Sequence, residues 1–266
     1  MTTNADGNIL SMNGVATVAL SNLDITSAAK TASAAIIASD IATSFTLKDS
    51  TFANIACQTP AALLSADKVP TLSISGSTFT NMSATSGVLV ITGDSEVTLN
   101  GCTFTSNVIS ENGVITMTNT TTLTVEACHF VQNSVYEGAM NLNQHATLTV
   151  AHSVFTGNQA ALQGGAISIS GAQSVTLTDN QVEQNTATGS EATGGAVTLI
   201  GAKNAVLSTR NNVFTNNTAN ITGGAMDITV ASWAAENDQY TSNGAQRTSA
   251  VNLGSSDPAV NAVAVL

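Results

Sequence analysis

The stretch FTGNQAALQGGAIS, residues 155–168, combines a Phe, an Asn three residues later and a pair of Gly before an alternating apolar segment. The chain contains seven Phe, and six of them occupy this one position in successive repeats. The residues at the aromatic position are Phe52, Phe79, Phe104, Phe130, Phe155, Val182, Phe214 and Tyr240. They lie 25 to 27 residues apart, with one longer interval of 32 residues between Val182 and Phe214. A regular period of this size is typical of a solenoid.

Within each repeat the apolar residues alternate with a period of two. Ile167-Ser168-Ile169 follows the Gly pair, Leu148-Thr149-Val150 precedes the next Phe, and the Phe lies on a third segment. This alternation is typical of half-buried β-strands. The pattern therefore predicts an all-β, right-handed, single-stranded parallel β-helix of about nine or ten coils. Each coil of about 26 residues would hold three short strands and pair with the next coil at ~4.8 Å.

The motif residues are expected to build these coils. We expect Phe155 to point inward and stack on Phe130, and Asn158 to occupy a left-handed bend with its amide bonded to the coils above and below. Gly164 and Gly165 would allow a sharp turn because they have no Cβ. We treat the motif as structural, with an adhesive role as the alternative. Its residues are Phe104, Asn107, Phe130, Asn133, Phe155, Asn158, Gly164, Gly165, Gly194, Gly195, Phe214, Asn217, Gly223 and Gly224.

We expect a single β-helix domain over residues 1–266. Residues 1–50 would form irregular N-terminal coils or a cap, residues 51–253 the regular repeats, and residues 254–266 a terminal segment. The first residues, MTTNADGNIL, lack the basic and apolar regions of a signal peptide, and the chain ends on the apolar AVNAVAVL. These ends predict a piece excised from a longer surface protein.

The repeat fades before Phe52. Strands of earlier coils are expected at VATVAL (15–20), LDI (23–25), SAAIIA (33–38) and FTL (45–47). In the coils of Phe52 and Phe79 the Asn falls one place early, at Asn54 and Asn81.

The composition excludes several classes of partner. Charged residues make up 9% of the chain, against about 25% in a typical soluble protein. Six Lys and Arg stand against seventeen Asp and Glu, for a net charge of −11. A phosphate-binding surface has no cations to use, so nucleic acid is not expected as a partner. No window approaches the roughly 18 apolar residues of a membrane span.

The paired motifs resemble the repeats of a known family. They are FTSN (104–107), FVQN (130–133), FTGN (155–158) and FTNN (214–217), with GGAI (164–167), GGAV (194–197) and GGAM (223–226). F-x-x-N alternating with G-G-A-[ILV] over residues 79–253 is similar to the chlamydial polymorphic membrane proteins. The resemblance implies the β-helical passenger of an autotransporter, displayed on the bacterial outer membrane and adhering to host cells. The chain departs from the pattern at SGV (86–88), NGV (112–114) and EGA (137–139), which replace GGA.

The sequence offers no catalytic constellation. Glycoside cleavage needs two carboxylates facing each other across a bond, and here the carboxylates are scattered. Asp227 is an acidic residue at an outward strand position with Arg210 about a coil away, and a solvated surface charge is the simpler interpretation. His129, His145 and His152 show no repeat at coil spacing with carboxylates or Cys. We expect no catalytic residue, no cofactor and no metal site.

Two cysteines occupy equivalent places in consecutive coils. Cys102 and Cys128 both lie two residues before their Phe, so their Cα atoms should be ~4.8 Å apart, within reach of a disulfide. The alternative is a stack of buried free thiols. Other coils carry Ser at this position, namely Ser50, Ser77 and Ser153.

A ladder of hydroxyl side chains follows the strand before the Phe. Its threonines are Thr98, Thr122, Thr124, Thr147, Thr149 and Thr176. Repeated T-x-T steps on a β-helix resemble the ice-binding faces of some antifreeze proteins. The simpler explanation is that Thr suits exposed strand positions.

Two further features are predicted to be exposed to solvent. The loop TATGSEAT (186–193) lengthens one coil, and such insertions often form the binding face of a solenoid. Asn81, Asn119, Asn216 and Asn220 begin N-x-[ST] sequons, which matter only in a eukaryotic secretory route.

These observations favour an extracellular or cell-surface protein fragment without catalytic activity. Its expected partner is a host-cell receptor or a glycan. The alternative is a structural β-helix whose coil ends self-associate into a filament, since unpaired strand edges tend to pair. Ice binding through the Thr ladder is a third, minor alternative.

Overall fold

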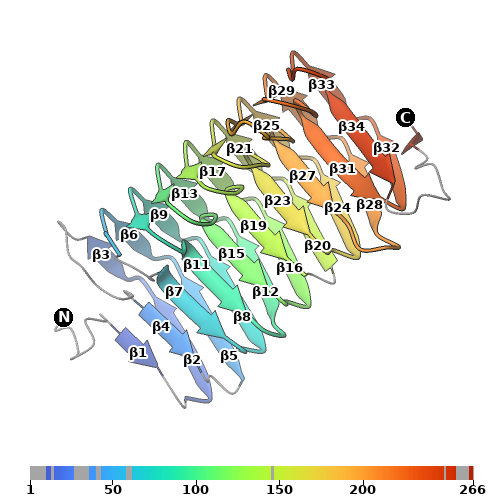
Figure 1. The fold of residues 1–266 in the computed structure, drawn as a ribbon. Helices are drawn as coiled ribbons and strands as arrows, with labels where there is room; N and C mark the ends of the chain where they lie inside the picture. Colours follow the sequence, from blue (N-terminus) through green and yellow to red (C-terminus); the bar gives the residue numbers. More distant parts are fainter. Residues whose placement is uncertain are drawn as a thin grey trace.

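The protein is described from a computed structural model, which covers residues 10–12, 15–26, 36–39, 43–57, 62–144, 147–248, 250–255 and 264–265. Every regular element in these ranges is a β-strand. The strands wind into successive coils stacked along one axis, with the first strands at one end and the last at the other (Figure 1). All paired strands are parallel, and the predicted β-helix is confirmed.

Four sheets, here named A to D, run along the axis. Sheet A consists of β1 (Leu10–Met12), β4 (Ile36–Ser39), β7 (Ala62–Asp67), β11 (Gly87–Thr92), β15 (Ile115–Thr118), β19 (Met140–Asn143), β23 (Ile167–Ser170), β27 (Val197–Ile200), β31 (Met226–Val230) and β34 (Val251–Ser255). Sheet B consists of β2 (Thr17–Ser21), β5 (Ser44–Lys48), β8 (Thr71–Ser75), β12 (Glu96–Asn100), β16 (Thr122–Glu126), β20 (Thr147–Ala151), β24 (Ser174–Thr178), β28 (Val206–Arg210), β32 (Ser232–Glu236) and β35 (Ala264–Val265).

Sheets C and D are built from shorter strands. Sheet C consists of β3 (Asp24–Thr26), β6 (Thr51–Ala53), β9 (Thr78–Thr80), β13 (Thr103–Thr105), β17 (His129–Val131), β21 (Val154–Thr156), β25 (Gln181–Glu183), β29 (Val213–Thr215) and β33 (Gln239–Thr241). Sheet D consists of β10 (Ser83–Ala84), β14 (Val108–Ile109), β18 (Ser134–Val135), β22 (Gln159–Ala160), β26 (Thr186–Ala187) and β30 (Thr218–Ala219). A complete coil passes through B, C, D and A in that order.

Sheets A, B and C are the three strands per coil that the sequence predicts. Sheet D was not predicted, because strands of two residues are too short to show a period. The N-terminal strands β2, β3 and β5 fall on the expected segments and pair in register with the later coils. The proposed division of the chain at residues 50 and 253 stays a prediction.

The aromatic column fills the interior of the β-helix. Phe130 and Phe155 are fully buried, and their rings stack with centroids 4.7 Å apart and parallel planes. The unbroken stack comprises Phe52, Phe79, Phe104, Phe130 and Phe155. Val182 interrupts the column, which resumes where Phe214 stacks on Tyr240 at 5.1 Å. In-register pairing places identical side chains one strand spacing apart, which is why the rings lie face to face.

The motif asparagines form a second interior ladder. The Nδ2 of Asn158 donates to the Phe130 carbonyl at 2.8 Å and to Asn185 Oδ1 at 2.9 Å. Its Oδ1 accepts from the backbone N–H and the Nδ2 of Asn133, at 3.1 and 2.8 Å. The same contacts link Asn107, Asn133, Asn158, Asn185, Asn217 and Asn243. Each buried amide therefore has both a donor and an acceptor in the neighbouring coils.

The expectation that Asn158 occupies a left-handed bend is wrong. The left-handed residue is the preceding one, Gly157, with a φ of 65°. A left-handed residue at this point turns the chain so that the next side chain enters the interior. Asn54 and Asn81, with φ of 56° and 52°, occupy the turn position itself, which explains why they come one place early.

The Gly pair is required by space as well as by backbone conformation. Gly164 has a φ of 59°, which favours glycine. A Cβ on Gly165 would overlap the Gly195 carbonyl oxygen, and a Cβ on Gly195 would overlap that of Gly224. The second Gly of each pair therefore lets neighbouring coils approach closely before sheet A begins.

A third column of polar side chains lies between sheets B and C. Its members are Ser50, Ser77, Cys102, Cys128, Ser153, Asn180, Asn212 and Asp238. Most accept a bond from the backbone N–H of the preceding coil, as in Ser153 N–H to Asn180 Oδ1 at 2.9 Å. The sequence pattern revealed only the Ser and Cys members, because the residue type changes along the column.

Cys102 and Cys128 are free, buried thiols, so the disulfide alternative is not formed in the structure. The Cys102 backbone N–H lies 3.4 Å from Cys128 Sγ, and the Cys128 thiol faces the Glu126 carbonyl at 3.3 Å. The neighbouring Cys102 thiol and burial raise the pKa of Cys128. Both cysteines thus perform the hydrogen bonding that Ser performs in other coils.

Candidate binding groove

Left-handed residues recur from coil to coil at three of the turns between sheets. The turn between B and C uses Asn22, Asp49, Gly76, Gly101, Ala127, His152, Asp179, Asn211 and Asn237. The turn between C and D uses Asn54, Asn81, Ser106, Gln132, Gly157, Gln184, Asn216 and Ser242. The turn between A and B uses Lys68, Gly93, Asn119, Gln144 and Gly171. Side chains at these positions project from the edges of the β-helix in columns.

Side chains of the B/C turn bond to one another from coil to coil. The Nδ1 of His152 lies 2.8 Å from Glu126 Oε1, and its Nε2 lies 3.6 Å from Asp179 Oδ2. Asn211 continues the row by donating to Asp179 Oδ1 at 2.9 Å. The expectation that no His lies at coil spacing from a carboxylate is therefore wrong for His152. Its 26- and 27-residue separations from Glu126 and Asp179 were visible in the numbering.

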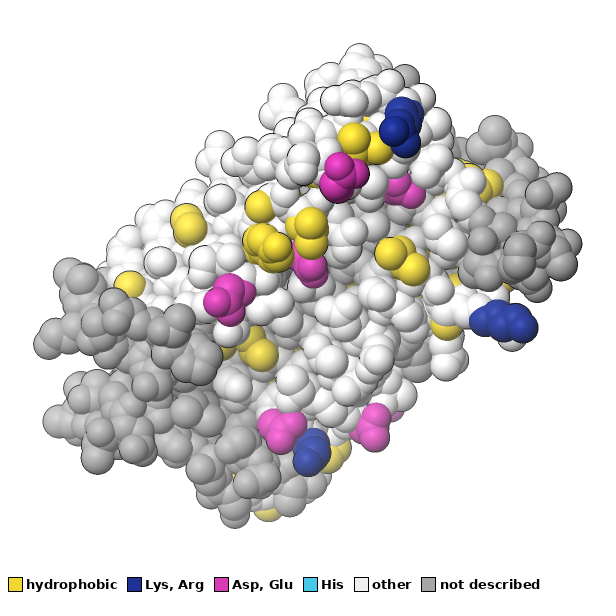
Figure 2. All heavy atoms as spheres, viewed as in Figure 1, with side chains coloured by type: hydrophobic (Ala, Val, Ile, Leu, Met, Phe, Trp, Pro, Cys, Tyr) yellow, Lys and Arg dark blue, Asp and Glu magenta, His cyan; other side chains and the backbone are white. Residues whose placement is uncertain are grey.

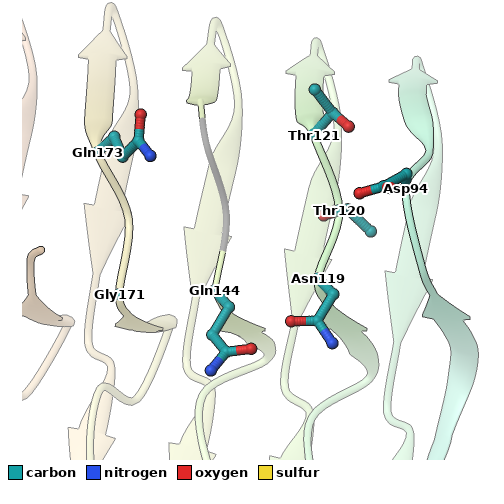
Figure 3. A pocket seen from close by; sticks show the side chains of 7 residues that line it. All are labelled: Asp94, Asn119, Thr120, Thr121, Gln144, Gly171 and Gln173. Carbon is teal, nitrogen blue, oxygen red and sulfur yellow. The ribbon is translucent and has the colours of Figure 1, made fainter.

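The A/B turn instead borders a groove of about 380 Å³. Figure 3 shows its side chains in successive coils, projecting from the turns that join sheet A to sheet B. The lining residues are Asp94, Asn119, Thr120, Thr121, Gln144, Gly171 and Gln173. Of these residues, only Asn119 belongs to a sequence motif named above, the N-x-[ST] sequon. A sequence signal for this turn does exist, because residues suited to a left-handed conformation recur just after the sheet A strands. They are Gly93, Asn119, Gln144 and Gly171.

Four polar side chains of this groove have no hydrogen-bond partner among the described residues. Asp94, Asn119, Gln144 and Gln173 are exposed, and their side chains make no hydrogen bond to any described residue. Some exposed amides of the other turns do pair, as Asn81 does with Asn54 at 3.2 Å and Asn237 with Asn211 at 3.3 Å. The groove is thus a place where amide and carboxylate groups remain open to a ligand.

The left-handed residues along the groove donate their backbone N–H groups to the next coil. The N–H of Asn119 donates to the Asn143 carbonyl at 3.0 Å, and that of Gln144 to the Ser170 carbonyl at 2.7 Å. Gly93 and Gly171 donate in the same way, at 3.1 and 2.7 Å. A ligand in the groove would therefore meet side chains rather than free strand edges.

The groove contains, among its described lining residues, one ionisable side chain, Asp94. It therefore lacks, in the described part of the chain, the facing carboxylate pair that glycoside cleavage requires. Across residues described in the structure, no group of three His, Cys, Asp or Glu side chains is placed to hold a metal ion. His145 lies outside the described residues. The arrangement supports binding through neutral hydrogen bonds.

The Thr ladder lies on the outer face of sheet B. Thr124 pairs in register with Thr98 and Thr149, and Thr149 with Thr176. Thr122 and Thr147 form the second column, which Glu96 and Ser174 flank. Thr98 is exposed and the other five are half-exposed. The ladder exists as a regular array, although its columns are short.

Asp227 is not a solvated charge near Arg210. Asp227 lies on β31 of sheet A and Arg210 on β28 of sheet B. The carboxylate is half-buried, accepting bonds from the Thr222 hydroxyl and from Asn252 Nδ2, the latter at 3.1 Å. The sequence placed Asp227 on an outward position but could not show that the preceding loop covers it.

The loop at 186–193 is hydrogen-bonded to the adjacent coil and keeps exposed residues. Asn220 Nδ2 donates to the Thr188 and Gly189 carbonyls, both at 2.8 Å. Ala192 is buried in a small cluster with Ala187 and Ala219. The loop is therefore fastened to the adjacent coil, with Ser190 and Glu191 exposed.

Uncharged polar groups dominate the surface. Figure 2 shows one face on which carboxylates, cations and hydrophobic side chains are scattered among neutral polar atoms. Within the described residues no helix is long and apolar enough to span a membrane.

Comparison with protein families agrees with the geometry. The model of the right-handed β-helix region matches residues 8–182. The chain therefore belongs to the right-handed β-helix family. Searches of curated proteins and of solved structures gave no match. Some β-helix families are enzymes, so family membership by itself leaves the activity open.

Proposed function

We propose that this β-helix is a non-catalytic adhesin-type fragment, displayed on the outside of a cell and binding a receptor or glycan on another cell. The observation that supports it best is the row of exposed, unpaired amides along the A/B turn. A rigid scaffold holds these groups at regular spacing, which limits the entropy lost on binding. The low charge and the F-x-x-N and G-G-A repeats, which resemble chlamydial polymorphic membrane proteins, point to the same role.

Cell binding tests this function directly. The labelled monomer is titrated onto cultured epithelial cells and competed with unlabelled chain, and a β-helix of unrelated sequence serves as the control. We expect saturable binding that the unlabelled chain displaces. Binding no stronger than that of the control would reject the adhesive function.

Ice binding is a second candidate because the Thr columns of sheet B are in register. A regular hydroxyl lattice is the feature that would contact an ice surface, and Thr124 and Thr149 lie at its centre. The test is thermal hysteresis of the wild type and of Thr124→Lys/Thr149→Lys. Hysteresis in the wild type that the double substitution removes would favour this candidate over adhesion.

Stacking of coil ends into a filament stays a prediction from the sequence. It would appear as concentration-dependent assembly in sedimentation velocity, whereas an adhesin of this type binds as a monomer.

A further inference from the structure

The A/B-turn groove combines a hollow in the surface with exposed amide side chains that have no partner among the described residues. Interior amides such as Asn158 have all their partners inside the protein. Those of Asn119, Gln144 and Gln173 have none among the described residues. Each exposed amide offers two donors and one acceptor oxygen to a ligand.

The groove is elongated along the helix axis. Its lining comes from four consecutive coils, which at ~4.8 Å per coil span about 14 Å between the first and the last. A second hollow, lined by Gln173, Ser174, Ala202, Lys203 and Asn204, shares Gln173 with it and extends the path to a fifth coil. A linear ligand lying parallel to the axis fits this shape better than a compact one.

The chemistry of the groove selects a hydroxyl-bearing chain. Because the strands of sheets A and B beside the groove are paired with a neighbouring strand on both edges, a peptide strand has no edge to pair with. Amide and hydroxyl side chains match ligands that carry both donors and acceptors at short intervals. The net charge of −11 and the Asp94 carboxylate repel sulfated or uronic acid polymers.

We propose that the A/B-turn groove binds an extended, neutral polysaccharide laid along the helix axis, with Asn119, Gln144 and Gln173 as its principal contacts. The proposal rests on the adhesive function above and assigns its ligand class. Successive coils would contact successive stretches of the polymer, so affinity should rise with oligosaccharide length until the groove is filled.

The variant that tests the site is Asn119→Gly/Gln144→Gly/Gln173→Ala. Gly already occupies the equivalent turn position in other coils, at Gly93 and Gly171, so the left-handed backbone is preserved. A matched control changes exposed amides of the C/D turn and of strand β25 in sheet C, Gln132→Gly/Gln184→Gly/Gln181→Ala. Gly157 shows that this turn also accepts Gly. Both variants are first checked for unchanged thermal unfolding.

The probes are arrays of neutral oligosaccharides, namely glucans, mannans and galactans of two to ten units, beside heparin as the anionic comparison. We expect the wild type to bind at least one neutral series, with affinity rising with length, and heparin not to bind. Removing three hydrogen-bonding side chains should weaken binding roughly tenfold or more. The control variant should bind as the wild type does. Absence of binding to every neutral series, or equal binding by the groove variant, overturns the proposal.

The same three proteins on epithelial cells separate this proposal from the adhesive function. Cell binding that survives in the groove variant means that the chain is an adhesin whose ligand lies elsewhere. Neutral oligosaccharide binding without cell binding means that the groove is a glycan site but host adhesion is wrong. Loss of both binding activities in the groove variant alone supports the two together.

Discussion

The interior ladder and the A/B-turn groove both contain rows of side-chain amides, but the amides are hydrogen-bonded to one another only in the interior. Inside, Asn158 lies between Asn133 and Asn185 and its hydrogen bonds close within the protein. At the A/B turn, Asn119 and Gln144 repeat at the same coil spacing, but their side chains point outward and stay unpaired among the described residues. The difference arises from one backbone position. Asn158 follows the left-handed Gly157 and enters the core, whereas Asn119 and Gln144 are themselves the left-handed residues and point to solvent.

The largest effect is expected from breaking the interior ladder. Asn158→Ala leaves the Phe130 carbonyl and the Asn133 amide without partners in the core, which should lower the free energy of unfolding by about 3 kcal/mol. Urea denaturation followed by circular dichroism measures it. Asn100→Ala, at the exposed end of β12, is the control and should change stability by less than about 0.5 kcal/mol. Equal losses in both variants would show that the ladder has no special role.

The next effect concerns Tyr240, a half-buried residue near the C-terminal end of the described coils. Burial and the nearby Asp238 carboxylate raise the pKa of Tyr240 above its ordinary value. The folded protein therefore holds this proton more tightly than the unfolded chain. Stability should be complete below about pH 10 and should fall above it, by about 1 kcal/mol per pH unit. Denaturation at pH 9 to 11 measures the slope, and Tyr240→Phe should flatten it. An unchanged slope in that variant contradicts the prediction.

A substitution of Asp238 is expected to stabilise the protein, with a change in the free energy of unfolding of similar size. Asp238 takes the place of Asn in the column of Asn180 and Asn212, and its Oδ2 is buried without a partner among the described residues. Asn212 Nδ2 donates to the Leu177 carbonyl at 2.8 Å, and by register the equivalent acceptor for residue 238 is the Thr209 carbonyl. Asp238→Asn should therefore raise the free energy of unfolding by about 1 kcal/mol.

A matched change at an exposed turn, Asp49→Asn, should leave stability within about 0.5 kcal/mol of the wild type. A loss of stability in Asp238→Asn would mean that the Oδ2 has a favourable partner in the folded protein.

The smallest stability effect is expected in the groove. Asn119→Gly/Gln144→Gly removes no hydrogen bond to a described residue and keeps the left-handed turns. The free energy of unfolding should therefore change by less than about 0.5 kcal/mol. Thermal unfolding measures it. A clear destabilisation would show that these amides support the fold, and would weaken the contrast between ladder and groove.

Much of the architecture was predictable because identical residues repeat at coil spacing. The Phe column, the Gly pairs and the alternating strands follow from periods of 26 and of two, and the chain order fixes which residues stack. The turn conformations were harder. Asn158 is next to the left-handed residue, and sequence spacing cannot distinguish the turn position from the inward one beside it. The two-residue strands of sheet D are likewise too short for a periodic signal.

The candidate site was mostly hidden in the sequence. Asp94, Gln144 and Gln173 belong to no motif, and they form a groove only because consecutive coils place them side by side. Asp227 differs from its prediction in the opposite direction. Its exposure was inferred from strand alternation, but contacts with Thr222 and Asn252 leave the carboxylate half-buried.

The sequence by itself determined that this protein is a parallel β-helix, since a repeated pattern of inward apolar side chains can be buried only by stacking coil on coil. It also determined which side chains form the aromatic and asparagine columns. Only the tertiary structure decided which polar groups satisfy one another and which remain open. That outcome depends on left-handed turns, coil-to-coil register and loop packing, which bring together residues with no shared pattern along the chain.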